Sequence, residues 1–387
     1  MSNLCILLFQ IINLAPYFLW LPKRYVFDTP FEREIKREVF KIVRRGREFG
    51  TPWFFVRVFI YISLLATLQY IWVSSGSSVR LAIMLGVSQA LIGLNVQHDA
   101  NHGAASRKSW VNDVLGFGAD FIGGCKWNWM SQHWTHHAYC NHREMDPDSI
   151  SSEPIFTWND YPKGDERRKS YHKYQGFYFL PMLSFYWLSE VFNPQILDLR
   201  QRGASSIGIK LDNDFIKRRR KYAIAIRALY IYMNVITPFL YHDVPTALLH
   251  IYVLGAVESL SLATLFSLSH NFENSDRDPT AEFRKTGKPV CWFKAQAETS
   301  STYGGLIAGC LTGGLNFQVE HHLFPRMSSA WYPFIAPTVR EVCKKHGVNY
   351  AYYPYVWKNL ISTIKYMHAA GNALNWDDSL RPLSGRN

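Results

Sequence analysis

Hydrophobic residues gather in four long runs along an otherwise mixed sequence. The runs cover residues 53–74, 79–97, 222–241 and 246–269. Each has about the 20 residues that a helix needs to cross a bilayer. Only the short turns 75–78 and 242–245 separate the members of each pair. The pattern therefore predicts two antiparallel hairpins of transmembrane helices.

The alternative is that these runs are buried helices of a large soluble protein. Arg227, His250 and Glu258 lie inside the runs and weaken their hydrophobicity. Ionisable residues within a membrane are costly and usually face a cavity or a partner. If the runs do span a membrane, Glu258 is therefore expected to line a cavity.

The placement of positive charge favours the transmembrane interpretation. Residues 23–49 contain nine Lys or Arg, and a run of five, Lys217 to Lys221, directly precedes the third hydrophobic run. The hairpin turns contain almost none. The positive-inside rule then places both large loops and the C-terminus in the cytosol. The net charge of +12 thus indicates orientation and anionic headgroups. No zinc-finger or helix-turn-helix pattern supports a nucleic-acid partner.

Four further assignments complete the predicted organisation. Residues 176–192 are apolar but contain Pro181, which favours a segment in the membrane interface. Residues 1–24 are hydrophobic without a positively charged start, so they fit either a signal anchor or a misplaced start. Residues 25–370 form one membrane domain, and 371–387 a C-terminal tail. The six cysteines have no regular spacing, which argues against a disulfide framework.

Histidine supplies the candidate chemistry, because eight of the fourteen histidines stand in patterned positions. Positions i, i+3 and i+4 share one helix face, so each motif presents its donors toward one point. His270 and the first motif each follow a hydrophobic run that ends at the same membrane face. The motifs are HxxxH (His98, His102), HxxHH (His133, His136, His137) and QxxHH (Gln318, His321, His322).

Eight imidazoles and one amide exceed the four protein ligands that a single zinc ion takes. The set therefore predicts two metal ions, whose identity imidazole alone does not select. The alternative, that these are ordinary surface or core histidines, is weak for three motifs together. The remaining histidines lack partners at helical spacing and are expected to be surface or packing residues: His142, His172, His242, His250, His346 and His368.

The sequence therefore predicts an all-α integral membrane protein. Four transmembrane helices form two hairpins, and a helical cytosolic cap holds a histidine-rich dimetal site. No HExxH, Walker loop, GxSxG or GxGxxG motif offers another chemistry.

The order HDANH, HWTHH and QVEHHLFP resembles the membrane fatty-acyl desaturases, and specifically their front-end group, whose third motif opens with Gln. The resemblance covers roughly residues 25–370. It includes Gly123-Gly124, Asp146-Pro147-Asp148, Ser269-His270-Asn271 and the segment 313–317.

The resemblance implies a non-haem di-iron centre that uses O2 and two electrons from NADH by way of cytochrome b5. The implied reaction places a cis double bond between an existing one and the carboxyl end of a polyunsaturated acyl-lipid or acyl-CoA. The implied location is the endoplasmic reticulum. The eight motif histidines, His270 included, would bind iron, and Gln318 would bind iron or hydrogen-bond to a ligand. Candidate acceptors for the imidazole N–H groups are Asp99, Asp146, Asp148, Glu320 and Asn316.

The chain departs from the front-end pattern in one respect. Such enzymes usually carry a cytochrome b5 domain with an HPGG motif, and this sequence has no HPGG. Either a separate cytochrome b5 and its reductase supply electrons, or the start has lost that domain. Two other functions stay open: a sphingolipid long-chain-base desaturase or acyl hydroxylase with the same centre, and a non-catalytic membrane protein.

Overall fold

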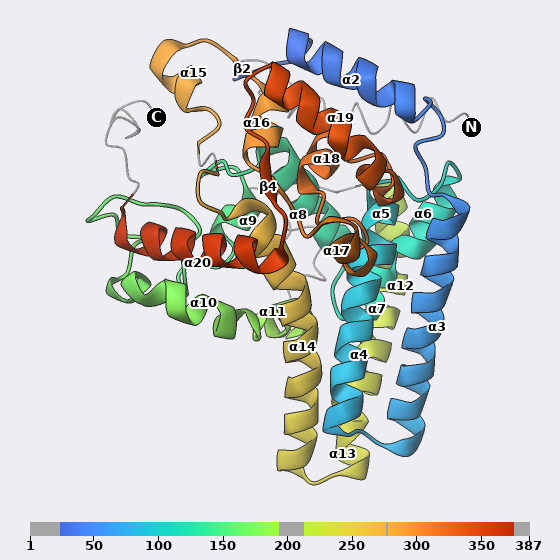
Figure 1. The fold of residues 1–387 in the computed structure, drawn as a ribbon. Coiled ribbons are helices and arrows are strands. Elements are labelled where there is room, and N and C mark those ends of the chain that lie inside the picture. The colour runs from blue at the N-terminus through green and yellow to red at the C-terminus, as the bar shows by residue number, and fades with distance from the viewer. Residues whose placement is uncertain (1–23, 193–212, 276–277, 375–387) are drawn as a thin grey trace.

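The computed structural model describes residues 24–192, 213–275 and 278–374. Four long helices stand side by side and carry a compact cap at one end (Figure 1). All four are long and apolar enough to cross a membrane: Pro52–Ser75, Val79–Asn101, Asp214–Tyr241 and Val244–His270. The predicted all-α membrane fold is confirmed. The predicted N-terminal segment and nearly all of the predicted tail, residues 1–23 and 375–387, lie outside the described residues.

Two of the four long helices are not continuous α-helix. The second consists of α4 (Val79–Ile92), the π-helix η2 (Gly93–Gln97) and α5 (His98–Asn101). The third consists of α12 (Asp214–Ile231), the π-helix η5 (Tyr232–Ile236) and α13 (Pro238–Tyr241). The other two are α3 (Pro52–Ser75) and α14 (Val244–His270).

The third helix begins at Asp214, before the predicted residue 222. The Asn213 side chain caps it by accepting a hydrogen bond from the backbone N–H of Ile216. The basic run Lys217–Lys221 is therefore part of the helix. Lys and Arg are good helix formers, so charge ends the hydrophobic run but not the helix.

The helices α4 and α14 pack closely along their length. Gly86 makes this approach possible, because a Cβ atom there would lie 2.6 Å from the carbonyl oxygen of Leu254. The three ionisable residues noted inside the hydrophobic runs, Arg227, His250 and Glu258, are buried. Arg227 donates to the carbonyl oxygens of Gly123 and Gly124, and the Nδ1 of His250 lies 2.9 Å from Ser77 Oγ. Glu258 is also buried, and its Oε2 has no hydrogen-bond partner.

The cap comprises described residues 24–51, 102–192 and 271–374. Its main core joins α2 (Pro30–Ile42) to α16 (Trp292–Glu298), α18 (Gln318–Leu323) and α19 (Tyr332–Lys345). Two small parallel sheets tie distant segments together, β1 (Tyr25–Val26) with β2 (Val290–Cys291) and β3 (Ser301–Tyr303) with β4 (Ala351–Tyr353). The other cap helices are α6 (Ser109–Gly116), α7 (Gly118–Phe121), α8 (Lys126–Tyr139), α9 (Pro147–Ile150), η3 (Ser170–Tyr174), α15 (Ala281–Thr286), α17 (Gly305–Thr312) and η6 (Ser329–Trp331).

Three cap helices lie across the axis of α14 (Figure 1). They are α10 (Gln175–Leu183), α11 (Tyr186–Phe192) and α20 (Val356–Asn372). The sequence predicted that 176–192 would lie in the interface and not span the membrane. Neither α10 nor α11 is among the four candidate spans, in agreement with the second part of this prediction, and the interface location stays a prediction.

Candidate metal centre

The two hairpins deliver histidines to the same end of the bundle. Both α4 and α14 begin at the hairpin end, and α5 and the last turn of α14 reach the cap (Figure 1). His98 and His102 therefore lie at the same end of the bundle as His270. All three histidines lie at the junction between the long helices and the cap.

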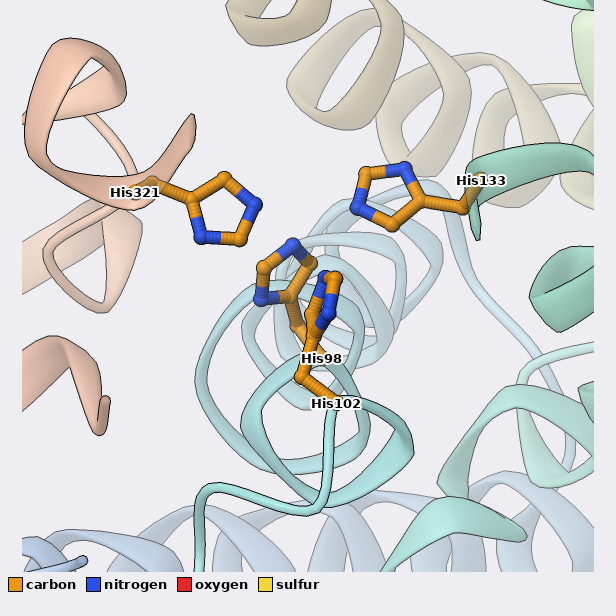
Figure 2. A group of neighbouring side chains, drawn as sticks. All are labelled: His98, His102, His133 and His321. Carbon is orange, nitrogen blue, oxygen red and sulfur yellow. The ribbon is translucent and has the colours of Figure 1, made fainter. Parts of the chain in front are cut away.

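One group of histidines converges from three elements. His98 and His102 come from α5 and its C-cap, His133 from α8 and His321 from α18. One ring nitrogen from each lies within 4.8 Å of the others. Figure 2 shows the four rings turned toward a common space. Two donors about 2.1 Å from one ion lie at most about 4.2 Å apart, so this spacing is close to that of a shared metal ion.

A second group joins α8, α14 and α18. His136, His270 and His322 meet with Cys140, again with ligand atoms within 4.8 Å of one another. Gln318 belongs to this group, because its Nε2 lies 3.1 Å from the Nε2 of His270.

His137 lies between the two groups. Its Nε2 is 2.9 Å from that of His321, and its ring stacks on His322 with centroids 4.2 Å apart. The expectation that each motif points its donors at a single place is therefore wrong for two motifs. His133 and His136 of one helix face different groups, and so do His321 and His322.

Hydrogen bonds on the outer side of the rings fix where the protons lie. His136 Nδ1 lies 2.9 Å from a carboxylate oxygen of Asp146, and His270 Nδ1 lies 3.0 Å from the Thr299 carbonyl oxygen. Carboxylate and carbonyl oxygens only accept hydrogen bonds, so each Nδ1 must carry its proton. In the neutral ring, Nε2 then bears a lone pair. These two Nε2 atoms lie 3.3 Å apart, an arrangement that a cation between them would stabilise.

The same logic applies to the third motif. His322 Nδ1 lies 2.8 Å from Gln296 Oε1, and His322 Nε2 is buried without a hydrogen-bond partner. The Tyr332 hydroxyl donates to the Met327 carbonyl oxygen and accepts from His321 Nδ1. His102 Nε2 is likewise buried and unpartnered. Buried polar atoms normally have partners, so these inward nitrogens fit a set of metal ligands.

Burial and the neighbouring imidazoles keep most of the rings neutral. They lower the pKa values of His102, His133, His137, His321 and His322 well below the usual value. His136 is the exception. Burial lowers its pKa, but the carboxylates of Asp146 and Asp148 outweigh burial and raise it well above the usual value. Metal ions bind the neutral form of imidazole, so the lowered pKa values favour a bound metal.

Of the five predicted acceptors, only Asp146 has its carboxylate within hydrogen-bond distance of an imidazole nitrogen. Asp148 lies farther from His136 Nδ1, at 3.6 Å. Asp99 instead accepts from Ser328 and Ser329, and Glu320 from Thr302 and Tyr350. Asn316 donates to the Tyr303 and Gly305 carbonyl oxygens. Asp99, Glu320 and Asn316 therefore form hydrogen bonds to neighbouring segments near the histidines and not to the imidazole rings.

Four groups beside the histidines were not predicted from the sequence. Gln296, Tyr332 and the Thr299 carbonyl oxygen come from segments without a motif, so no sequence signal marked them. Cys140 could have been found, because it follows His136 at the helical spacing i+4. Its Sγ lies 3.4 Å from His270 Nδ1, and burial raises its pKa, so it is a thiol at neutral pH.

The six remaining histidines lie outside both groups. His172 Nε2 lies 2.8 Å from the Pro154 carbonyl oxygen, and His346 Nε2 lies 2.7 Å from Glu34. His242 and His250 pack together at the hairpin end of the bundle. His142 lies beside Arg24, and His368 is exposed near Asn372.

The fold and these two adjoining groups define a helical integral membrane protein with a histidine-rich site that can hold two metal ions. Residues 75–354 match the sequence profile of the family described as "Fatty acid desaturase". Because this match covers well over half of the chain, the protein belongs to the fatty acid desaturase family and is an oxidoreductase.

Curated relatives agree with the family. An "Acyl-lipid (7-3)-desaturase" of Rebecca salina is 32% identical over 84% of this chain and 71% of its own length. The chloroplastic enzyme of the same name in Chlamydomonas reinhardtii is 33% identical over 75% of this chain and 56% of its own. A "Delta(5) fatty acid desaturase A" of Dictyostelium discoideum is 26% identical over 90% of this chain and 76% of its own.

Proposed function

We propose that this protein is a front-end desaturase of polyunsaturated acyl chains, carried by lipid or by coenzyme A. It introduces a cis double bond on the carboxyl side of an existing one. The observation that carries the proposal is the pair of adjoining histidine groups, with Gln318 of the third motif 3.1 Å from His270. The relatives named acyl-lipid and Delta(5) desaturases support the same reaction.

In this proposal two iron ions bind the histidine groups. His98, His102, His133 and His321 would hold the first, and His136, His270 and His322 the second, while His137 lies next to both groups. Gln318 would bind the second ion or hydrogen-bond to one of its ligands. When bound, the iron pair uses O2 and two electrons to supply the oxidising power for an unactivated methylene, which side-chain acids and bases lack.

The protein's own contribution is to hold the rings and exclude water. Asp146, Thr299, Gln296 and Tyr332 fix the outer nitrogens, so the inner nitrogens are oriented before metal binds. Burial of the motif histidines keeps bulk water away from the reacting methylenes. Overall, the acyl chain loses two hydrogens, and O2 takes these together with two electrons and two protons to form two waters.

The proposed electron source is NADH, through a cytochrome b5 reductase and a separate cytochrome b5. The proposed location is the endoplasmic reticulum, with the cap in the cytosol. The positive charges of residues 23–49 and 217–221 support this orientation. The chloroplastic relative makes a plastid membrane the alternative to test by imaging.

The decisive experiment is expression in yeast with fed C18, C20 and C22 polyunsaturated fatty acids, read by gas chromatography and mass spectrometry. We expect one substrate class to gain a double bond nearer its carboxyl end. His136→Ala, His270→Ala and His322→Ala should each abolish the product while the protein stays in the membrane. His368→Ala, which changes an exposed histidine, is the matched control. Full activity of purified His322→Ala would contradict the metal assignment.

Gln318 has its own test within the same assay. Gln318→His should cause severe loss of product, because the larger ring changes the donor geometry beside His270. Near-normal turnover would show that Gln318 only packs against the site. Altered long-chain bases in place of altered fatty acids would point to sphingolipid as the substrate.

A further inference from the structure

The short helix α17 (Gly305–Thr312) exposes an unusual apolar surface. Ile307 is 84% exposed, and Leu306 and Leu311 are 68% and 63% exposed. These exposed fractions are similar to that of Phe59, which is 71% exposed on α3, a candidate membrane span. Contiguous apolar surface of this kind marks contact with a membrane or another protein.

Although α17 belongs by sequence to the cap, it lies on the flank of the long helices and is therefore a part of the cap close to the bilayer. The Tyr61 hydroxyl of α3 donates to the Cys310 carbonyl oxygen, and Asn95 Nδ2 donates to that of Leu311, at 3.2 Å each. In Figure 1, α17 lies in front of α4 where the bundle meets the cap.

The depth of these contacts follows from helix geometry. Tyr61 is fourteen residues from the hairpin end of α3 at Ser75, and Asn95 is sixteen from that of α4 at Val79. At 1.5 Å per residue, these are about 21 and 24 Å, and both are less than the roughly 30 Å of a hydrocarbon core. The contact surface of α17 therefore lies at a depth where lipid tails surround the bundle.

A helix that does not span can lie at this depth only if its backbone is satisfied. Besides the bonds from Tyr61 and Asn95, the Gly314 N–H donates to the Gly309 carbonyl oxygen at 2.9 Å. The helix ends at Gly313, whose φ of +68° suits glycine and whose Cβ would lie 2.7 Å from the Leu94 carbonyl oxygen. The last turn is thus closed by protein groups and not by water.

An aromatic pair continues this surface toward the headgroups. A Cβ on Gly304, at the start of α17, would lie 2.8 Å from Val356. On either side of Val356, the rings of Tyr355 and Trp357 stack with centroids 5.9 Å apart, and both side chains are exposed. Lys358 Nζ lies 5.6 Å from both ring centroids. Trp, Tyr and a nearby Lys are the residues that favour the membrane–water interface.

We propose that α17 and residues 355–357 form a re-entrant membrane insertion in the leaflet on the cap side. Leu306, Ile307 and Leu311 contact phospholipid acyl chains, and the aromatic pair lies among the headgroups. The opposite face of α17 abuts the segment before the third histidine motif, since Thr312 Oγ1 donates to Asn316 Oδ1. The insertion therefore holds this side of the metal centre against the bilayer. The proposal rests on the membrane fold and not on the proposed reaction.

The test places a photoreactive benzoylphenylalanine at position 307 of the full-length protein in phosphatidylcholine nanodiscs. After irradiation, mass spectrometry measures lipid adducts. Phe59 provides the lipid-exposed reference, and Ile42 at the C-terminal end of α2, an exposed apolar residue of the cap, provides the aqueous control. We expect about tenfold more lipid adduct at position 307 than at position 42, and a yield like that at 59.

Position 306 repeats the measurement if the probe at 307 prevents folding. A lipid yield at both positions equal to that at 42 would overturn the proposal. Adducts with a second copy of the chain, or with residues 1–23 of the same chain, would overturn it too, because protein would then cover this surface. The result is independent of enzymatic turnover, so an inactive protein can still confirm or refute the insertion.

Discussion

At the scale of single side chains, the histidines differ in what holds their outer nitrogen. His136 faces a carboxylate, whereas His270, His321 and His322 face a carbonyl, a hydroxyl and an amide. A carboxylate raises the basicity of the ring more than a neutral acceptor does. The Asp146–His136 pair is therefore expected to contribute most to metal affinity among these four.

Asp146→Asn tests this contribution. The change removes the negative charge 2.9 Å from His136 Nδ1 and places an amide where the backbone N–H of Asn141 donates. We expect metal content or turnover to fall about 10- to 100-fold. Iron content of the purified protein and product formation are the measurements. Asp28→Asn, in an exposed ion pair with Arg33, is the control. Equal iron content in both variants would refute the role of Asp146.

At the scale of helices, the motif spacing predicted which residues gather but not how they divide. His133, His136 and His137 occupy helix α8, yet they serve two groups, because His133 lies near His321 of α18 and His136 near His322. The angle between two helices is set by packing far from either motif. The acceptors on α16 and α19 escaped prediction for the same reason.

The π-helix η2 is a second feature that hydrophobic patterning did not predict. It lies between the hydrophobic part of α4 and His98. One extra residue in the helix rotates all following side chains by about 100°. A helical wheel drawn from residue 79 would therefore place His98 and His102 on the wrong face. The gathering of the motif histidines could be predicted because that prediction used spacing within motifs, not the register of the whole run.

Gly86→Ala tests whether α4 and α14 position the metal ligands together. The added methyl would lie 2.6 Å from the Leu254 carbonyl oxygen and force the helices apart. We expect a loss of about 1–3 kcal/mol in stability, and lower metal content, because these helices lead to His98 and His270. Thermal unfolding and iron analysis in detergent measure both. Met84→Leu, at an exposed position of α4, should change neither. If Gly86→Ala matches it, the close packing is not required.

At the scale of the whole molecule, the long helices and the cap both contribute histidines to the one buried candidate metal centre. Hydrophobicity predicted the long helices and histidine spacing predicted the metal centre. For the cap, the sequence predicted only that it is helical and not how its helices are arranged. The cap's order comes from contacts between distant segments, such as α2 on α19 and β3 beside β4. Such pairings join residues that no local pattern relates.

The charge state of this centre makes the stability of the metal-free protein depend on pH. Burial lowers the pKa values of His102, His133, His137, His321 and His322 below the 6.5 of an exposed ring. Below pH 6.5 the unfolded chain therefore binds more protons than the folded one, and stability falls as pH falls. Above pH 6.5 these five rings are neutral in both states and contribute no pH dependence. His136, whose pKa is raised, acts in another range: its contribution to stability is full below pH 6.5 and is lost as pH rises above that value. The buried carboxyls of Asp120 and Glu320, whose pKa values burial raises to about 7, oppose the five rings between pH 5 and 7.

We therefore expect the melting temperature of the metal-free protein in detergent to fall from pH 7 to 8, as His136 loses its proton. Between pH 6.5 and 5 the five rings lower it against the opposing effect of the buried carboxyls, so their share is measured by removing one ring. Bound iron should raise the melting temperature at pH 7.5, because it binds the folded state, and this gain should shrink on acidification as protons compete for the imidazoles. Differential scanning fluorimetry with parallel iron analysis measures both effects. His322→Ala, which removes one of the five rings, should show a shallower acid slope. An acid slope between pH 6.5 and 5 that is the same in His322→Ala as in the unchanged protein would show that this ring is hydrated and not buried in the folded protein.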